Sequence, residues 1–173
     1  VSLDGSTVPV AGISKIAAED VAQFTAHGYV CKLLSTGKQT DEGVCAYVQP
    51  TLVPVGQPES AVPANYNLIT LVGETSGRMS FYGQGAGRYP TAYNVVQDCV
   101  DLMEGKGFYS PYGSRVSAAN RQELSYYVRG GQWDDILETW GNGVITAPVS
   151  VEKMHQWRKD HPDAFIAALK GNE

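Results

Sequence analysis

The sequence lacks any long apolar run. Its longest apolar stretches, such as residues 68–72, are strand-sized, whereas a membrane-spanning helix needs about 20 apolar residues. It also lacks a secretory signal pattern and clusters of basic residues, because the 13 Lys and Arg are dispersed and the net charge is −5. Since phosphate groups bind clustered Lys and Arg, we expect no nucleic-acid partner and no membrane partner.

Cysteine is scarce, and its spacing excludes two kinds of site. Cys31, Cys45 and Cys99 are odd in number and form no C-x-x-C pattern, so neither a disulfide framework nor a zinc site is indicated. We predict buried, reduced thiols, as in a cytoplasmic protein. His155 and His161 have no Cys or carboxylate cluster at ligand spacing, so no metal site is expected.

The remaining composition is that of a soluble globular protein. Apolar residues make up 43% of the 173 residues and charged residues 18%, enough for one domain with a small appendage. The chain begins at Val1 without a Met and opens in a polar stretch. This start resembles the interior of a longer protein.

Hydrophobic periodicity and turn residues predict an α+β fold. We expect a largely antiparallel or mixed sheet with helices on one face, because successive strands are joined by short turns. Glu19 and Asp20 fall in a first helical turn, where the dipole favours solvated negative charge, and His27 ends that helix. The predicted elements are helices over 17–27 and 90–104, and strands over 29–36, 44–52, 67–72 and 78–82.

The residue pattern near the end of the chain differs from that of the preceding part and predicts a small α/β module. Residues 105–122 are rich in Gly, Ser and Tyr and are predicted to be a linker between residues 1–104 and the module at 123–173. Trp133, Trp140 and Trp157 are expected to anchor this module's core or an interface. Its predicted elements are strands at 124–129 and 143–147, a helix at 133–140, and helical sequence over 149–169 that Pro162 interrupts.

A glycine-rich loop, YGQGAGRYPTA at residues 82–92, is the one sharp chemical signal. A strand leads into it and a helix follows, so its backbone N–H groups could hold a phosphate or carboxylate. Arg88 stands where a dinucleotide fingerprint needs Gly or Ala, and no acidic residue ends a second strand downstream, so a complete Rossmann domain is not indicated. On the residues alone, the loop fits a tight structural turn and a ligand contact equally well.

Several segments in order resemble bacterial homoserine dehydrogenases. They are GISKIAAEDV (12–21), YVCKLLSTGK (29–38), VCAYVQPTLVP (44–54) and FYGQGAGRYPTAYNVVQD (81–98), and the resemblance covers residues 8–102. That family interconverts L-homoserine and L-aspartate 4-semialdehyde with NADP or NAD, in the biosynthesis of threonine, methionine and isoleucine. Its members join a Rossmann domain to a catalytic and dimerisation domain, and many add an ACT domain.

The resemblance implies specific roles for parts of this chain. The family's catalytic Lys pattern, D-x-x-G-x-D-x-x-x-K, is absent, so no catalytic residue is assigned. Cofactor contact is implied for Gly83, Gly85, Ala86 and Gly87, and the helix after them would pack on the Rossmann portion. Residues 123–173 resemble a reduced ACT-like module.

The leading interpretation is therefore a cytoplasmic C-terminal portion of homoserine dehydrogenase, inactive without the upstream part. The implied partners are homoserine or aspartate semialdehyde and a second subunit in a homodimer. Two alternatives remain: an amino-acid-sensing regulatory module, and an assembly domain whose sheet of residues 29–82 forms a dimer interface. Binding of an amino acid by the chain would favour the first alternative, and dimerisation without any ligand response the second.

Overall fold

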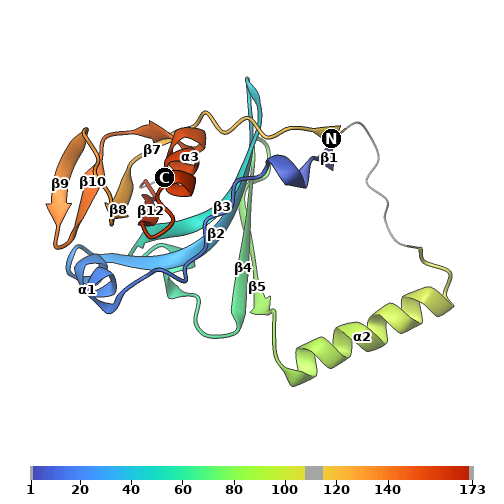
Figure 1. The fold of residues 1–173 in the computed structure, drawn as a ribbon. Coiled ribbons are helices and arrows are strands. Elements are labelled where there is room, and N and C mark those ends of the chain that lie inside the picture. The colour runs from blue at the N-terminus through green and yellow to red at the C-terminus, as the bar shows by residue number, and fades with distance from the viewer. Residues whose placement is uncertain (1, 108–114, 172–173) are drawn as a thin grey trace. The chain divides into compact units, whose positions relative to one another are not determined.

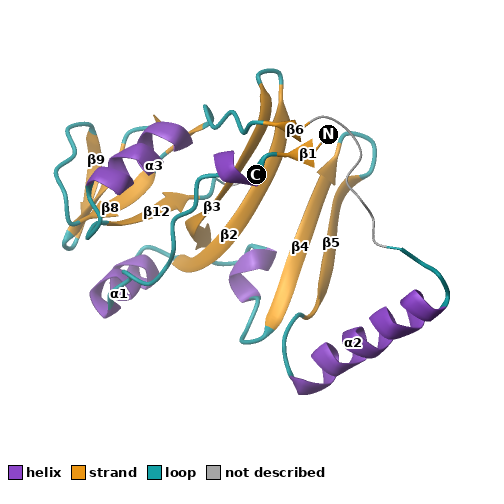
Figure 2. Cartoon of the chain, turned by 45° about the vertical axis from the view of Figure 1, so that its right-hand side comes forward, coloured by secondary structure: helices purple, strands orange, loops and turns teal. Residues whose placement is uncertain are grey.

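The computed structural model describes residues 2–107 and 115–171 and divides the chain into two compact units (Figures 1 and 2). The first unit combines Val1–Ser60 with Tyr112–Glu173, and the second is Ala61–Pro111. Early and late segments of the chain therefore share one unit.

A six-stranded sheet forms the centre of the first unit. β12 runs parallel to β3 and antiparallel to β8, and the other neighbouring strands are antiparallel. The sheet is therefore mixed and mostly antiparallel, as predicted. Its order is β2 (Tyr29–Thr40), β3 (Gly43–Pro54), β12 (Phe165–Leu169), β8 (Tyr126–Arg129), β10 (Gly143–Thr146) and β9 (Ile136–Trp140).

The helices α1 (Ala18–Ala26) and α3 (Val151–Asp160) lie on opposite faces of this sheet (Figure 1). Successive side chains of a strand point to opposite faces. Accordingly, Tyr127 packs in one cluster with Phe24 of α1, and Tyr126 packs in another with Met154 of α3. The prediction of helices on one face is wrong for this sheet, because β8 is apolar on both faces and each face must be covered.

Short elements complete the first unit. β1 (Ser2–Leu3) pairs in parallel with β6 (Arg115–Val116), and β7 (Glu123–Leu124) pairs antiparallel with β11 (Val149–Ser150). Two 3-10 turns, η1 and η2, span Gly5–Thr7 and Pro58–Ala61.

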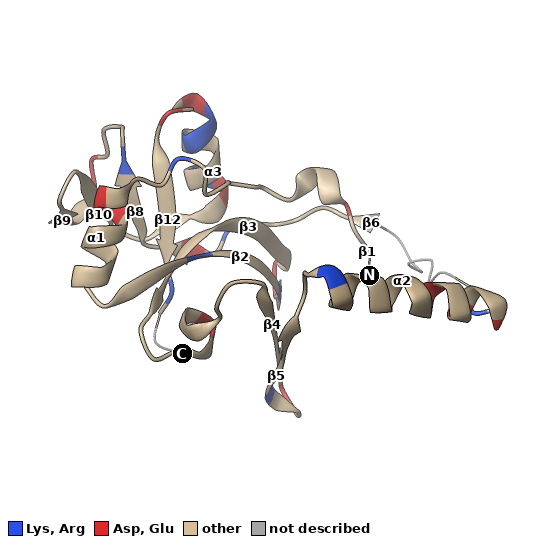
Figure 3. Cartoon of the chain, turned by 90° about the horizontal axis from the view of Figure 1, so that it is seen from below, with Lys and Arg blue, Asp and Glu red and all other residues tan. Residues whose placement is uncertain are grey.

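α3 begins and ends with residues suited to a helix. The Ser150 hydroxyl accepts a hydrogen bond from the Lys153 N–H at the N-terminus. Glu152 lies in the first turn, and Arg158 and Lys159 lie in the last. Figure 3 shows acidic residues of α3 in red and basic residues in blue. These charges complement the helix dipole, so the polar sequence of α3 is consistent with a helix that buries only one side.

The second unit consists of a hairpin and one helix. β4 (Tyr66–Gly73) pairs antiparallel with β5 (Gly77–Gln84), and α2 (Arg88–Met103) follows. All side chains described in this unit are exposed or half-buried. A two-stranded hairpin and a single helix cannot enclose a core, so their apolar side chains remain on the surface.

Most predicted elements are confirmed, and the errors lie in the tail. The hairpins, the helices at 17–27 and 90–104 and the strand at 143–147 all form, with small shifts at their ends. The predicted strand at 124–129 is divided at Ser125: Leu124 ends β7, and residues 126–129 form β8 of the six-stranded sheet. The predicted helix at 133–140 is wrong, because Ile136–Trp140 is strand β9. Helical structure over 149–169 also stops early: α3 ends at Asp160, and Phe165–Leu169 is strand β12.

The domain boundaries stay predictions. The predicted linker, 105–122, includes residues 108–114, which lie outside the described residues. In its described part, the Asn120 side chain is buried and its Oδ1 accepts a hydrogen bond of 2.9 Å from the Ala46 N–H.

Candidate functional site

The predicted cofactor-contacting residues form the turn between β5 and α2. Gly83 lies in β5 opposite Asn67, Gly85 and Ala86 follow the strand, and Gly87 is the N-cap of α2 with φ of 128°. Few residues other than glycine adopt that φ. The turn thus brings the four residues together at the exposed start of a helix.

Hydrogen bonds to the segment before β4 fix the shape of the turn. The Gly85 N–H donates to the Asn65 carbonyl at 3.1 Å, and the Asn65 Nδ2 donates to the Ala86 carbonyl at 2.6 Å. A Cβ at position 85 would overlap the side-chain amide of Asn67. A larger residue there must therefore displace Asn67 and distort the turn.

The start of α2 can hold an anion. Among the described residues, no side chain caps the helix at Gly87, and the first helical bond runs from the Thr91 N–H to the Gly87 carbonyl at 3.1 Å. The first N–H groups of a helix have no partner within it and carry partial positive charge. Such a terminus suits a phosphate or carboxylate, but whether this turn contacts a cofactor stays a prediction.

A second polar cluster joins α1 to the tail. The Asp20 side chain, 1% exposed, accepts bonds from Arg129 Nε and Nη2 at 2.7 and 3.0 Å. It also accepts bonds from the Tyr127 hydroxyl at 2.7 Å and the Ala17 N–H at 2.8 Å. The interpretation of Asp20 as a solvated charge is therefore wrong. The local sequence gives no signal to the contrary, because its charged partner lies 109 residues away.

These contacts keep Asp20 ionised. Burial opposes the charged form, but the hydrogen bonds from Arg129, the Ala17 N–H and Tyr127 outweigh burial and lower the pKa of the carboxyl. At neutral pH, Asp20 and Arg129 thus form a buried, bidentate ion pair.

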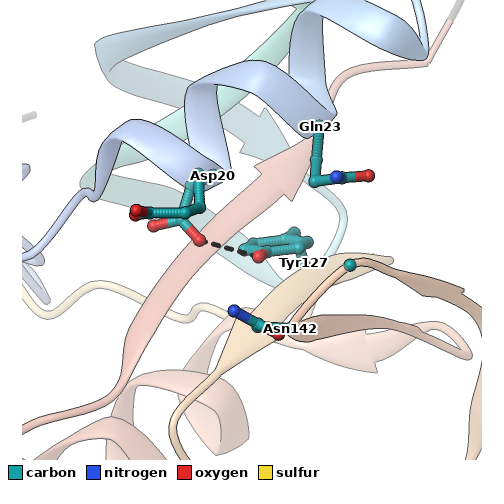
Figure 4. A pocket seen from close by; sticks show the side chains of 6 residues that line it. Asp20, Gln23, Tyr127 and Asn142 are labelled. Carbon is teal, nitrogen blue, oxygen red and sulfur yellow. Dashed lines mark hydrogen bonds between the residues drawn. The ribbon is translucent and has the colours of Figure 1, made fainter.

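A small pocket of about 170 Å³ lies beside Asp20 (Figure 4). The Asp20 and Tyr127 side chains meet on one side of it, and Gln23 and Asn142 lie nearby (Figure 4). Its polar groups are carboxylates, amides and a phenol, which suit a small polar molecule. The lining residues are Glu19, Asp20 and Gln23 of α1, Tyr127 of β8, and Gly141 and Asn142 of the β9–β10 turn.

A third buried polar cluster joins β3, β8 and α3. His155 Nε2 lies 2.8 Å from Gln49 Oε1, and the Tyr126 hydroxyl donates to the same oxygen at 3.3 Å. Burial, with a smaller contribution from Lys159 and Arg158, lowers the pKa of His155 to about 4. His155 is therefore neutral at physiological pH and fits a role as a hydrogen-bonded core residue.

His27 and the tryptophans of the tail lie where the sequence predicts. His27 forms the C-cap of α1 and stacks on Trp140 at 3.9 Å between ring centroids. Trp157 packs against Trp133 at 5.4 Å, so the tryptophans anchor tail packing as predicted.

The cysteines follow their prediction only in part. Cys45 is buried, and burial raises the pKa of the half-buried Cys31 to about 12. Cys99 lies exposed on α2, contrary to the prediction of buried thiols, because no described residue of the second unit covers it.

Comparisons with known proteins match this chain to one enzyme family. The family model for homoserine dehydrogenase matches residues 1–100. The homoserine dehydrogenase of Bacillus subtilis is 40% identical over 103 residues, covering 60% of this chain and 24% of that enzyme. That of Lactococcus lactis is 30% identical over 135 residues, covering 73% of this chain and 31% of the enzyme. An alignment of that length must reach beyond residue 100.

Solved structures share the fold. The Staphylococcus aureus homoserine dehydrogenase at pH 7.0 gives a TM-score of 0.63 at 20% identity, covering 98% of this chain and 49% of that one. The enzyme from Thiobacillus denitrificans gives 0.63 at 20% identity, covering 94% and 48%.

The mixed α/β fold is shared with these solved dehydrogenases, and the strand–glycine turn–helix segment lies within the residues that the family model matches. The chain belongs to the homoserine dehydrogenase family, whose members are oxidoreductases. It spans about a quarter of the length of the curated relatives it matches. Within the described residues, every helix is too short or too polar to cross a membrane.

Proposed function

We propose that this chain forms the C-terminal part of an NADP- or NAD-dependent enzyme that interconverts L-homoserine and L-aspartate 4-semialdehyde. The observation that carries the proposal is the family match over residues 1–100, which includes the whole glycine turn. The activity would serve the biosynthesis of threonine, methionine and isoleucine in the cytoplasm. The chain alone would be inactive, because hydride transfer needs the nucleotide site and the catalytic Lys supplied by the upstream part.

The proposed role of Gly83, Gly85, Ala86 and Gly87 is to form a wall of the cofactor site. Support comes from the exposed backbone of the turn and the uncapped start of α2. On α2, Val96, Val100 and Met103 are 62%, 40% and 88% exposed and recur at helical spacing. This apolar stripe is suited to packing on the nucleotide-binding domain.

A homodimer is the proposed assembly, and the β4–β5 hairpin supports it. Ile69 lies opposite Phe81 and Leu71 lies opposite Met79, so these four side chains share one face. All four are between 43% and 61% exposed. An apolar sheet face of this kind marks an interaction surface, and a second copy of the enzyme would cover it.

The proposed organisation is a catalytic portion at 1–104, a linker at 105–122 and a reduced ACT-like module at 123–173. Within the module, β8, β9, β10, α3 and β12 follow the order of a β-α-β-β-α-β motif whose first helix is missing. Residues 130–135 take the place of that helix. This agreement in order supports the assignment.

The test is homoserine-dependent formation of NADPH or NADH by the gene product that contains this chain. Wild type should be active, and Gly85→Val should lower kcat/KM by at least about tenfold through distortion of the turn. Gly37→Val is the matched control, because a Cβ at Gly37 meets no atom within 4 Å. A folded wild-type protein that forms neither NADPH nor NADH from homoserine would rule out the proposal. An equal decrease of kcat/KM in Gly85→Val and Gly37→Val would contradict the proposed role of the turn.

A complementation assay tests whether the catalytic groups lie in the part of the enzyme upstream of this chain. The chain of 173 residues should give no turnover alone. Turnover should appear when it is co-expressed with the upstream part of the Bacillus subtilis enzyme, whose region matching this chain is 40% identical to it over 103 residues. Turnover by the chain alone would contradict the proposal that the catalytic groups lie upstream.

A further inference from the structure

Three tail side chains reach the segment of residues 12–21. Arg129 Nη2 donates to the Lys15 carbonyl at 2.7 Å, and its Nε and Nη2 bind the Asp20 carboxylate. The Tyr127 hydroxyl binds the same carboxylate, and Asp163 lies 3.1 Å from the Lys15 ammonium. Segment 12–21 lies within the family match, whereas these tail residues lie beyond it.

We propose that Arg129 is a positioning residue, through which the tail holds segment 12–21 in the conformation that the dehydrogenase needs. This rests on the proposed function. The tail then acts as a built-in part of the catalytic portion, and Arg129 is the tail side chain that contacts both Lys15 and Asp20.

Arg129 is suited to this role because it bridges two different parts of the segment. Its planar group reaches the loop at Lys15 and the first turn of α1 at Asp20 together. Only 23% of the Arg129 side chain is exposed, and Asp20 is almost fully buried. The pair is therefore shielded from salt and solvent, unlike the exposed Arg121–Glu42 pair.

Other contacts hold the flanks of the segment independently of Arg129. Before it, the Ala11 N–H donates to the Val48 carbonyl of β3 at 2.8 Å. After it, Phe24 of α1 packs edge-to-face on Tyr127 at 4.8 Å between ring centroids. Loss of Arg129 should therefore free the loop at 12–17 while α1 stays docked.

The first test separates positioning from stability in the gene product. Arg129→Met should lower kcat by roughly 10- to 100-fold if the reaction needs the conformation of this segment, because misplacing positioned groups costs rate. It should also lower Tm, because the buried Asp20 carboxylate loses its cation and keeps only the bonds from Tyr127 and Ala17. Adding Asp20→Asn removes that charge but does not restore the bond to Lys15. The double variant should therefore regain much of the Tm while kcat remains low, and Arg121→Met should change neither.

Recovery of kcat together with Tm would overturn the proposal, since Arg129 would then only stabilise. Unchanged kcat in Arg129→Met would overturn it as well. If the wild-type gene product has no dehydrogenase activity, the proposed function fails, and hydrogen exchange on the chain then tests the contact by itself. Arg129→Met should speed exchange at the amides of residues 12–17 relative to Arg121→Met, and equal exchange would contradict the proposed hold.

Discussion

At the scale of single residues, the buried polar side chains connect segments that are far apart in the sequence. Gln49 of β3 binds His155 of α3, and Asp20 of α1 binds Arg129 of β8. No local pattern distinguishes Asp20 from its exposed neighbour Glu19, because the distinction arises from a partner in the tail. Such pairs could not be predicted from the sequence alone. The glycine turn could, because its strand, turn and helix are consecutive.

His155 should make stability depend on pH. Its pKa is about 4 in the folded chain, against 6.5 ordinarily, so the folded state binds fewer protons. Above pH 6.5 the full stability is present. As pH falls from 6.5 toward 4, the unfolded chain takes up a proton that the folded chain excludes, and the free energy of unfolding falls by about 3 kcal/mol.

Urea unfolding at a series of pH values measures this effect. His155→Gln keeps an amide that can donate to Gln49 and removes the titrating group, so the loss between pH 6.5 and 4 should shrink. Asp20 adds its own loss at more acidic pH, since its pKa is lowered and its stabilisation disappears on protonation. An unchanged pH profile in His155→Gln would exclude His155 as the source.

At the scale of elements, the sequence predicts those helices and strands whose hydrophobic periodicity and flanking turn residues indicate the same structure. The β2–β3 and β4–β5 hairpins meet this condition. Residues 133–140 form too short a pattern to separate helix from strand, whereas the two-residue turn Gly141–Asn142 that follows is typical of a hairpin. That turn joins β9 to β10 with a φ of 59° at Gly141. Likewise, the apolar run at Phe165–Leu169 is compatible with a helix or a strand. It forms a strand because it pairs with β3 on one side and β8 on the other.

Strands of this sheet should differ in their contribution according to position. β12 is central, and Phe165 is 1% exposed, so Phe165→Ala should lower the free energy of unfolding by about 3–5 kcal/mol. Leu137 of the edge strand β9 is 64% exposed, and Leu137→Ala should cost less than about 0.5 kcal/mol. Denaturant unfolding of both variants compares them, and similar losses would contradict a central role for β12.

At the scale of the whole molecule, the second unit leaves a large apolar surface uncovered. The chain alone should therefore self-associate through the hairpin face of Ile69, Leu71, Met79 and Phe81. Phe81→Lys should reduce this association, since it places a charge in the centre of the face. Val55→Lys, at a residue 66% exposed in the first unit, is the matched control.

Sedimentation velocity over a range of concentrations measures the association. A larger monomer fraction for Phe81→Lys than for Val55→Lys is the expected result. A wild-type chain that is monomeric at high concentration would contradict the proposed use of this face.

The place of β12 in the sheet also bears on how the protein is made. β12 comes after all its sheet partners in the chain, yet it lies between β3 and β8. A nascent chain on the ribosome thus carries β3 and β8 with open edges until residues 165–169 emerge. The two apolar clusters on the faces of the six-stranded sheet include β12 side chains, so a message truncated just before this strand would yield a product with two incomplete cores. Cellular proteases would degrade such a product as they degrade an unfolded chain, although most of its sequence is intact.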